Sequence, residues 1–202
     1  RQEIIRRYFK TGCEYKKGEV NKSSYDTMSL IMEKSNLKPE DRKVVVPARE
    51  YSEKLKSMIE SDELCTVVAL ELNDGTIITG RSSELMCASA AAILNAVKVL
   101  ANIPDDMLLI SPVILEPIVK LKTETLGSRQ VSLSLEEVLT ALSICAVTNP
   151  AAQMAMDELS NLEGSQAHST TMLSKDDEQT FRKLGVDVTC EAVYPSQNLY
   201  YV

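Results

Sequence analysis

The only histidine of the chain is the first candidate for chemistry at neutral pH. His168 stands in the segment 164–171, where serine and threonine hydroxyls surround it. Imidazole is the side chain whose ordinary pKa lies nearest 7, and neighbouring hydroxyls can fix which ring nitrogen carries the proton. We expect His168 near a strand end, where the sites of α/β proteins usually lie. The alternative is a structural histidine that is held by hydrogen bonds.

A thiol and a carboxylate follow the last apolar run of the sequence, at Cys190 and Glu191. If their strand lies beside the strand of His168, a thiol–imidazole pair for nucleophilic catalysis is geometrically possible. Together with Ser169, these residues form the candidate catalytic set: His168, Ser169, Cys190 and Glu191. The alternative for Cys190 is a buried structural thiol.

A weaker candidate is an anion-binding site at the start of an expected helix. Arg81, Ser82 and Ser83 precede the apolar run that begins at Leu85. Backbone N–H groups at a helix start, together with an arginine, can hold an anion. The same serines are also ordinary helix caps.

Other common chemistries are disfavoured by the sequence. The usual motifs for phosphate-binding loops, dinucleotides, zinc proteases and serine hydrolases do not occur. The five cysteines are scattered without a C-x-x-C pair, which predicts no metal site and indicates a reducing compartment. We therefore expect no metal, and no cofactor within this segment.

Apolar spacing, turn residues and capping residues divide the chain into alternating elements. Asn73-Asp74-Gly75 marks a hairpin turn, and Ser134 with Glu137 forms a capping box. We expect, in chain order, helices over 1–17, 23–35 and 47–61, a hairpin of strands 64–72 and 76–80, a helix over 85–102, a strand over 107–110, helices over 112–126, 134–147 and 150–159, a strand over 166–173, a helix over 174–185 and a strand over 186–193.

This order predicts an α/β fold. We expect a three-layer α/β/α sandwich with a mixed sheet, in which an antiparallel hairpin joins parallel strands linked by crossover helices. Because the sequence begins without Met in a helical pattern, we interpret 1–46 as a helical segment that continues from a missing N-terminal domain. The sandwich domain would then cover 47–202.

The composition and net charge disfavour some classes of binding partner and cellular compartment. The chain has 202 residues, 44% of them hydrophobic and 25% charged, which is typical of a soluble globular protein. A net charge of −7 disfavours binding to nucleic acid or to an anionic membrane surface. The most apolar stretch, 85–103, is interrupted by Asn95 and Lys98 and does not predict a membrane span. We see no signal peptide and expect a cytoplasmic protein.

Several segments together resemble one bacterial family. They are RQEIIRRYF at 1–9, GCEYKKG at 12–18, ALSICAVTNP at 141–150, AHS at 167–169 and LGVDVTCE at 184–191. In order and over nearly the whole length, the chain is similar to the C-terminal part of the domain-of-unknown-function 1846 family. The resemblance implies a cytosolic protein with a larger N-terminal part that carries a glycine-rich phosphate-binding loop. Some members are labelled ATP-dependent peptidases, a label that no residue here supports, and no catalytic residue is carried over.

A second resemblance is topological, to the cytidine-deaminase-like sandwich. Enzymes of that fold hold zinc with His/Cys-Ala-Glu and Pro-Cys-x-x-Cys at the starts of two helices. This chain has Cys87-Ala88-Ser89 at the first position and PVILE from Pro112 at the second. Because most zinc ligands and the proton-transfer glutamate are missing, we expect no deaminase activity.

These observations favour an accessory domain of a bacterial protein. Its expected role is packing, oligomerisation or completing a site, with its own N-terminal domain and further copies of itself as partners. Any nucleotide would bind the missing N-terminal domain. The alternative is that His168 and Cys190 contribute directly to catalysis in a nucleotide-dependent enzyme.

Overall fold

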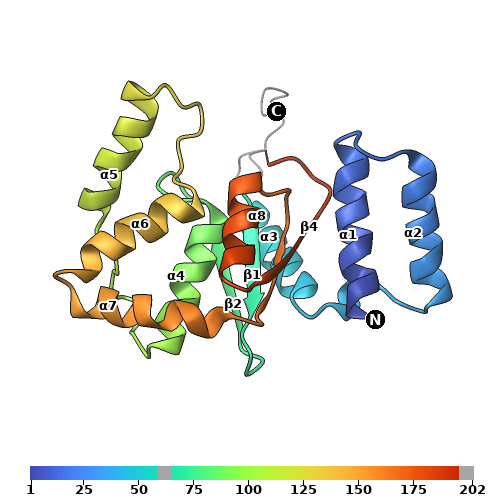
Figure 1. Ribbon diagram of the computed structural model, residues 1–202, viewed down its shortest axis with the longest axis horizontal. Helices are drawn as coiled ribbons and strands as arrows, with labels where there is room; N and C mark the ends of the chain where they lie inside the picture. Colours follow the sequence, from blue (N-terminus) through green and yellow to red (C-terminus); the bar gives the residue numbers. More distant parts are fainter. Residues whose placement is uncertain (59–64, 196–202) are drawn as a thin grey trace.

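The computed structural model describes residues 1–58 and 65–195 (Figure 1). Along the chain, helices alternate with the strands of a small sheet, as predicted. The elements are α1 (Gln2–Lys16), α2 (Lys22–Lys34), η1 (Pro39–Asp41), α3 (Val45–Met58), β1 (Val67–Glu71), β2 (Ile77–Arg81), α4 (Ala88–Leu100), α5 (Pro112–Lys120), the π-turn η2 (Leu121–Thr125), α6 (Leu135–Ala146), α7 (Pro150–Asp157), η3 (Glu158–Leu162), β3 (Gln166–Ser169), α8 (Lys175–Lys183) and β4 (Asp187–Cys190).

The strands form one mixed sheet in the order β2-β1-β3-β4. The predicted hairpin is confirmed: β1 and β2 pair antiparallel, and Gly75 takes the positive φ of +88° that the turn needs. β3 pairs antiparallel with β1 and parallel with β4. The prediction of an α/β fold with a mixed sheet is therefore confirmed, although only one strand pair is parallel.

One face of the sheet carries the main apolar core. Val68 and Leu70 of β1 and Ala167 of β3 pack there with α4, α6, α7 and α8. α4 approaches β2 closely because its facing residues are alanines and because Gly80 has no side chain. In Figure 1, α5 lies above α6 at the upper left of the molecule.

α1 and α3 cover the opposite face, and α2 packs outside α1 (Figure 1). The predicted helical N-terminal segment is therefore confirmed. It lies directly on the sheet, since Phe9 of α1 contacts His168 of β3 with ring centroids 4.7 Å apart. The expected boundary at residue 46 stays a prediction. No helix within residues 1–58 and 65–195 is both long and apolar enough to cross a bilayer.

Two predicted elements are wrong in their position or type. The helix expected over 85–102 begins at Ala88, because Cys87 is its N-cap and Met86 pairs with Leu133 in an isolated bridge. The strand expected over 107–110 is absent: Leu109 and Ile110 are buried in bends of the chain, so their apolar character reflects burial rather than pairing in a sheet.

The strand expected over 166–173 ends at Ser169. The hydroxyl of the next residue, Thr170, accepts a hydrogen bond from the backbone of Val67, and the chain then turns toward α8. The ends of the helix over 47–61 and of the chain lie outside the described residues.

Candidate functional site

A polar layer lies between the sheet and the α1–α3 helices. In a sheet, paired residues on neighbouring strands point to the same face. Gln166 pairs with Asp187, and His168 pairs with Thr189. The side chains of these four residues therefore face the N-terminal helices, together with Glu191, which follows β4.

His168 is completely buried and both of its ring nitrogens have partners. Nδ1 lies 2.9 Å from the Thr189 hydroxyl, and Nε2 lies 3.2 Å from Oε1 of Glu191. Burial lowers the pKa of His168 more than the hydrogen bond to Glu191 raises it. The ring is therefore neutral at pH 7, and the two contacts are satisfied when Nε2–H donates to Glu191 and the Thr189 hydroxyl donates to Nδ1.

Glu191 connects this histidine to the helical layer. Burial favours its neutral form, but hydrogen bonds from His168 and Arg49 outweigh burial and keep the pKa of Glu191 below its ordinary value. Arg49 Nε on α3 donates to Oε1 of Glu191 at 2.7 Å and also forms an ion pair with Glu40. Glu191 is therefore a carboxylate that orients the imidazole and is itself neutralised by Arg49.

A second buried cation, Arg42, stands beside this chain of groups. Its side chain has no exposed surface and donates to Gln166 Oε1 at 2.8 Å, to the Ala167 carbonyl at 3.1 Å and to the Asp187 carbonyl at 2.6 Å. Burial lowers the pKa of Arg42, and the nearby Asp187 carboxylate opposes that shift. Asp187 also pairs with Arg6 of α1. Arg42 therefore holds β3 and β4 together at the end where both strands begin.

Cys190 and Ser169 lie on the other side of the sheet from His168. They pair with each other across β3 and β4, one residue on from the His168–Thr189 pair, so their side chains point toward the α4 layer. Burial raises the pKa of the Cys190 thiol, which is protonated at neutral pH. Of the four candidate catalytic residues, the fold brings together His168 and Glu191 and separates both from Ser169 and Cys190.

The candidate anion site lacks the helix start on which it depended. Arg81 ends β2, and Ser82 and Ser83 lie in the turn that follows. The Ser83 hydroxyl accepts a hydrogen bond from the Met86 amide at 3.2 Å, whereas the first amides of α4 lie beyond Cys87. Anion binding by these three residues stays a prediction without a helix N-terminus to support it.

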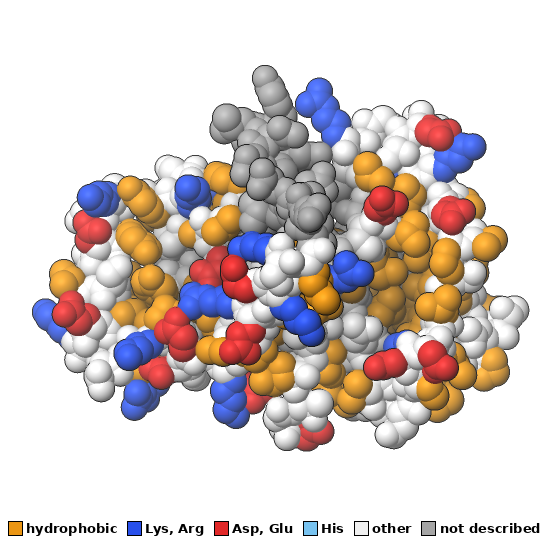
Figure 2. Space-filling model, turned by 180° about the vertical axis from the view of Figure 1, so that it is seen from behind, with side chains coloured by type: hydrophobic (Ala, Val, Ile, Leu, Met, Phe, Trp, Pro, Cys, Tyr) orange, Lys and Arg blue, Asp and Glu red, His pale blue; other side chains and the backbone are white. Residues whose placement is uncertain are grey.

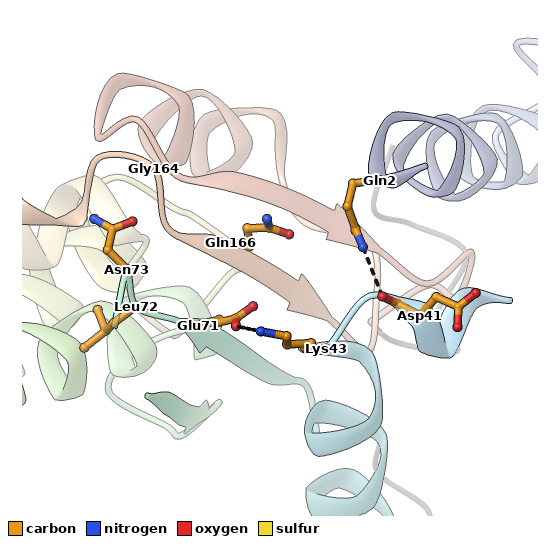
Figure 3. A pocket seen from close by; sticks show the side chains of 8 residues that line it. All are labelled: Gln2, Asp41, Lys43, Glu71, Leu72, Asn73, Gly164 and Gln166. Carbon is orange, nitrogen blue, oxygen red and sulfur yellow. Dashed lines mark hydrogen bonds and ion pairs between the residues drawn. The ribbon is translucent and has the colours of Figure 1, made fainter. Parts of the chain in front are cut away.

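A pocket of about 360 Å³ opens near the start of β3 (Figure 3). Lys43 Nζ pairs with Glu71 Oε1 at 2.8 Å across it, and Gln2 donates to the Asp41 carbonyl at 3.0 Å. Gln166 also lines this pocket while it accepts from Arg42. Because the lysine is already paired with Glu71, the pocket presents no free cation of its own to an anionic ligand.

Several members of the polar layer were missed from the sequence. Arg42, Arg49 and Thr189 have no motif, and their roles depend on contacts with β3, β4 and Glu191 that join distant parts of the sequence. The one available signal was Arg42 itself, a cation just before the apolar run 44–46. Within the described ranges, no three His, Cys, Asp or Glu side chains are placed to hold a metal ion.

The fold and the buried polar layer define an α/β/α domain whose ionisable groups mainly satisfy one another. The model of the family described as "Domain of unknown function DUF1846, C-terminal" matches residues 40–200, and the chain belongs to this family. The predicted family resemblance is confirmed.

Curated relatives are similar over nearly the whole chain. A UPF0371 protein of Clostridioides difficile strain 630 is 70% identical over 200 residues, which are 99% of this chain and 40% of that protein. UPF0371 proteins of Clostridium botulinum strain Langeland and of Clostridium tetani are 67% and 64% identical and are likewise covered over 40% of their length. The chain therefore spans about two fifths of these relatives.

Proposed function

We propose that this chain is the accessory module of a longer protein and docks onto the rest of that polypeptide. The observation that carries the proposal is the exposure of α5. Its sequence, PVILEPIVK, is strongly apolar, yet only Leu115 is buried. A soluble helix ordinarily buries its apolar side chains, so such a helix indicates a contact surface.

The surface extends beyond α5 itself. Figure 2 shows hydrophobic side chains gathered over the half of the molecule that holds α4 to α7. Exposed large apolar residues of α5, its π-turn and the end of α6 make up what we call the α5–α6 surface: Val113, Ile114, Leu121, Leu126, Ile144 and Val147. Val113 is 75% exposed and Val147 is 82% exposed. Burying each such side chain would contribute about 1.5–3 kcal/mol.

The rest of the polypeptide is the occupant that the length of the relatives supports. Because the chain spans 40% of each of these relatives, most of such a protein lies outside the described fold. A covalently joined partner is always present at high effective concentration, so a moderate apolar surface suffices for docking.

Thiol labelling of the full-length protein tests the proposal. Val113→Cys on the α5–α6 surface is compared with Leu30→Cys on α2, where Leu30 is 53% exposed. We expect maleimide to modify position 113 at least about tenfold more slowly than position 30, measured by mass spectrometry of each peptide. Equal rates would contradict docking. Protection that disappears on dilution would assign the surface to a second copy and contradict docking within one polypeptide.

A second candidate function is direct participation in catalysis, and the His168–Glu191 pair supports it. A carboxylate that orients an imidazole is the arrangement a general base uses. Substrate access would require α1 to move, because Phe9 lies against the ring and His168 is buried. Its test is nucleotide triphosphate hydrolysis by full-length His168→Ala and wild-type proteins that fold equally well. A loss of about a hundredfold or more supports catalysis, and unchanged turnover contradicts it.

A further inference from the structure

The outer strand of the sheet offers unpaired backbone groups. β4 is a terminal strand: the amide of Asp187, its first residue, and the amide of Glu191, just after it, donate to the carbonyls of Ser165 and Ser169. Because hydrogen-bonding groups alternate along a strand, the N–H and C=O of Val188 and the N–H of Cys190 point away from β3. An open strand edge of this kind can pair with another extended chain.

A groove runs along this open edge. It has a volume of about 780 Å³, and residues Val186 to Cys190 form its floor. α1 supplies one wall and α8 supplies the other. From α1, the Cys13 thiol donates to the Cys190 carbonyl at 3.3 Å and so covers one end of the edge. The groups of Val188 remain as the accessible centre.

The walls carry an excess of unpaired positive charge. Two of the lining cations are engaged, since Arg6 pairs with Asp187 and Lys10 lies 3.8 Å from Glu14. Four others have no carboxylate within ion-pair distance in the part of the chain that the structure describes: Arg7, Lys17, Lys175 and Arg182. Among the carboxylates that line the groove, only Glu19 and Glu178 have no cation within ion-pair distance in the described residues. The cationic groups stand on both walls, whereas the chain as a whole has a net charge of −7.

We propose that the groove between α1 and α8 binds an extended acidic peptide segment, which adds to the sheet as a fifth strand beside β4. Backbone hydrogen bonds to Val188 would supply the pairing, and Arg7, Lys175 and Arg182 would select carboxylate side chains. A second copy of this chain fits less well. A two-fold pairing of β4 with itself would bring the same surplus cations together, at a cost in repulsion.

Peptide binding to the full-length protein tests this inference. The probe is a fluorescein-labelled acetyl-(Glu-Thr)4-amide, whose affinity is measured by anisotropy at low salt. Its matched controls are acetyl-(Lys-Thr)4-amide and a Glu-Thr peptide that is N-methylated at every residue, so that neither edge of the extended peptide can donate a backbone hydrogen bond. We expect both control peptides to bind at least about tenfold more weakly than the Glu peptide. The Lys peptide carries positive rather than negative charge, and the N-methylated peptide has no backbone amide donors.

Variants locate the site. The double variant Arg7→Gln, Arg182→Gln should weaken binding of the Glu peptide by about tenfold, whereas Lys34→Gln on α2 should leave it unchanged. Val188→Pro removes the outward amide of an edge strand, where proline is tolerated, and should abolish binding. If that variant fails to fold, the N-methylated peptide still tests the backbone pairing.

Three results would overturn the inference. The Glu peptide shows no binding, or binds no better than the Lys peptide. Alternatively, N-methylation has no effect, which would leave a charged patch without strand addition. Finally, sedimentation could show a dimer that Val188→Pro dissociates, which would make a second copy the occupant.

Discussion

The buried ionisable residues are held in different charge states by their neighbours. His168 stays neutral because burial and the cations Arg42 and Arg49 all lower its pKa more than Glu191 raises it. Arg42 stays charged because carbonyl oxygens of β3 and β4 accept hydrogen bonds from its guanidinium. At pH 7 the polar layer thus combines a neutral imidazole with paired charged groups. Acid, or the loss of one partner, should therefore lower the stability of the fold.

Acid should destabilise the protein through His168. Its pKa is lowered in the folded state from an ordinary value of 6.5, so the unfolded chain binds more protons between the two pKa values. Stability is therefore full above about pH 6.5 and falls as the pH drops through that window, by at most about 1.4 kcal/mol per pH unit for one proton. Protonation of Glu191 also lowers the stability of the folded state, but only below about pH 4.5, the ordinary pKa of a glutamate.

Urea denaturation at pH 7.5, 6.5 and 5.5 measures this effect. His168→Gln removes the only imidazole of the chain, so the variant should lose most of the change between pH 7.5 and 5.5. An unchanged pH dependence in the variant would show that another group is responsible.

Loss of Arg42 should be far more damaging than loss of its neighbour. Arg42→Met leaves the Gln166 side chain and two strand carbonyls without their donor, and we expect a loss of about 3–5 kcal/mol in the free energy of unfolding. Lys43→Met is the matched control. Lys43 is 73% exposed, so its ion pair with Glu71 should contribute less than about 1 kcal/mol to the free energy of unfolding. Similar losses in both variants, measured by urea denaturation, would contradict this role for Arg42.

The sequence identified only part of this site. His168 and Glu191 were candidates because their chemistry is visible in the residue types, and they do lie within hydrogen-bond distance. We expected Cys190 beside His168 because their strands were expected to be neighbours. The strands are neighbours, but His168 pairs with Thr189, so the side chain of Cys190, the next residue, points to the other face of the sheet. Arg49 enters from α3, and no local pattern in the sequence predicts that contact.

Individual elements were predictable where their signals are local. The hairpin follows from Asn73-Asp74-Gly75, and the capping box is present, with Ser134 Oγ accepting from the Glu137 amide at 3.3 Å. The strand expected over 107–110 was wrong because four apolar residues show burial without showing a hydrogen-bonded neighbour. Sheet membership is a long-range property, whereas turns and caps are set within a few residues.

The contact between α4 and β2 gives a sharp test at this scale. A Cβ on Gly80 would lie 2.2 Å from the backbone nitrogen of Ala92, so Gly80→Ala must push the helix away from the sheet. We expect a loss of about 3 kcal/mol or more in the free energy of unfolding.

Gly75→Ala provides the control for this substitution. Gly75 has a positive φ but open space around it, so alanine there should cost only about 1–2 kcal/mol of backbone strain. Urea denaturation of both variants compares the two positions. A smaller loss at Gly80 than at Gly75 would contradict the close packing of α4 on β2.

At the scale of the whole molecule, the two sides of the sheet differ in what they leave exposed. The α1–α3 side closes over a polar layer that satisfies most of its own groups, whereas the opposite side ends in α5, where Val113 and Ile114 are exposed. We therefore propose the α5–α6 surface for the contact with the rest of the longer protein, and the separate groove beside β4 for a different partner.

Docking through the α5–α6 surface should couple the unfolding of this domain to that of the remaining polypeptide. In the full-length protein, the double variant Val113→Asp, Leu126→Asp places charges in the proposed contact, where both wild-type residues are more than 70% exposed in this chain. Because a buried unpaired carboxylate is costly, the two parts should separate, and a single calorimetric transition should split into two. Leu30→Asp on α2 introduces one carboxylate at an exposed apolar position outside the surface and should leave the single transition intact. If the double variant also melts in one transition at the wild-type temperature, the α5–α6 surface does not carry the coupling, and docking must occur elsewhere on the domain.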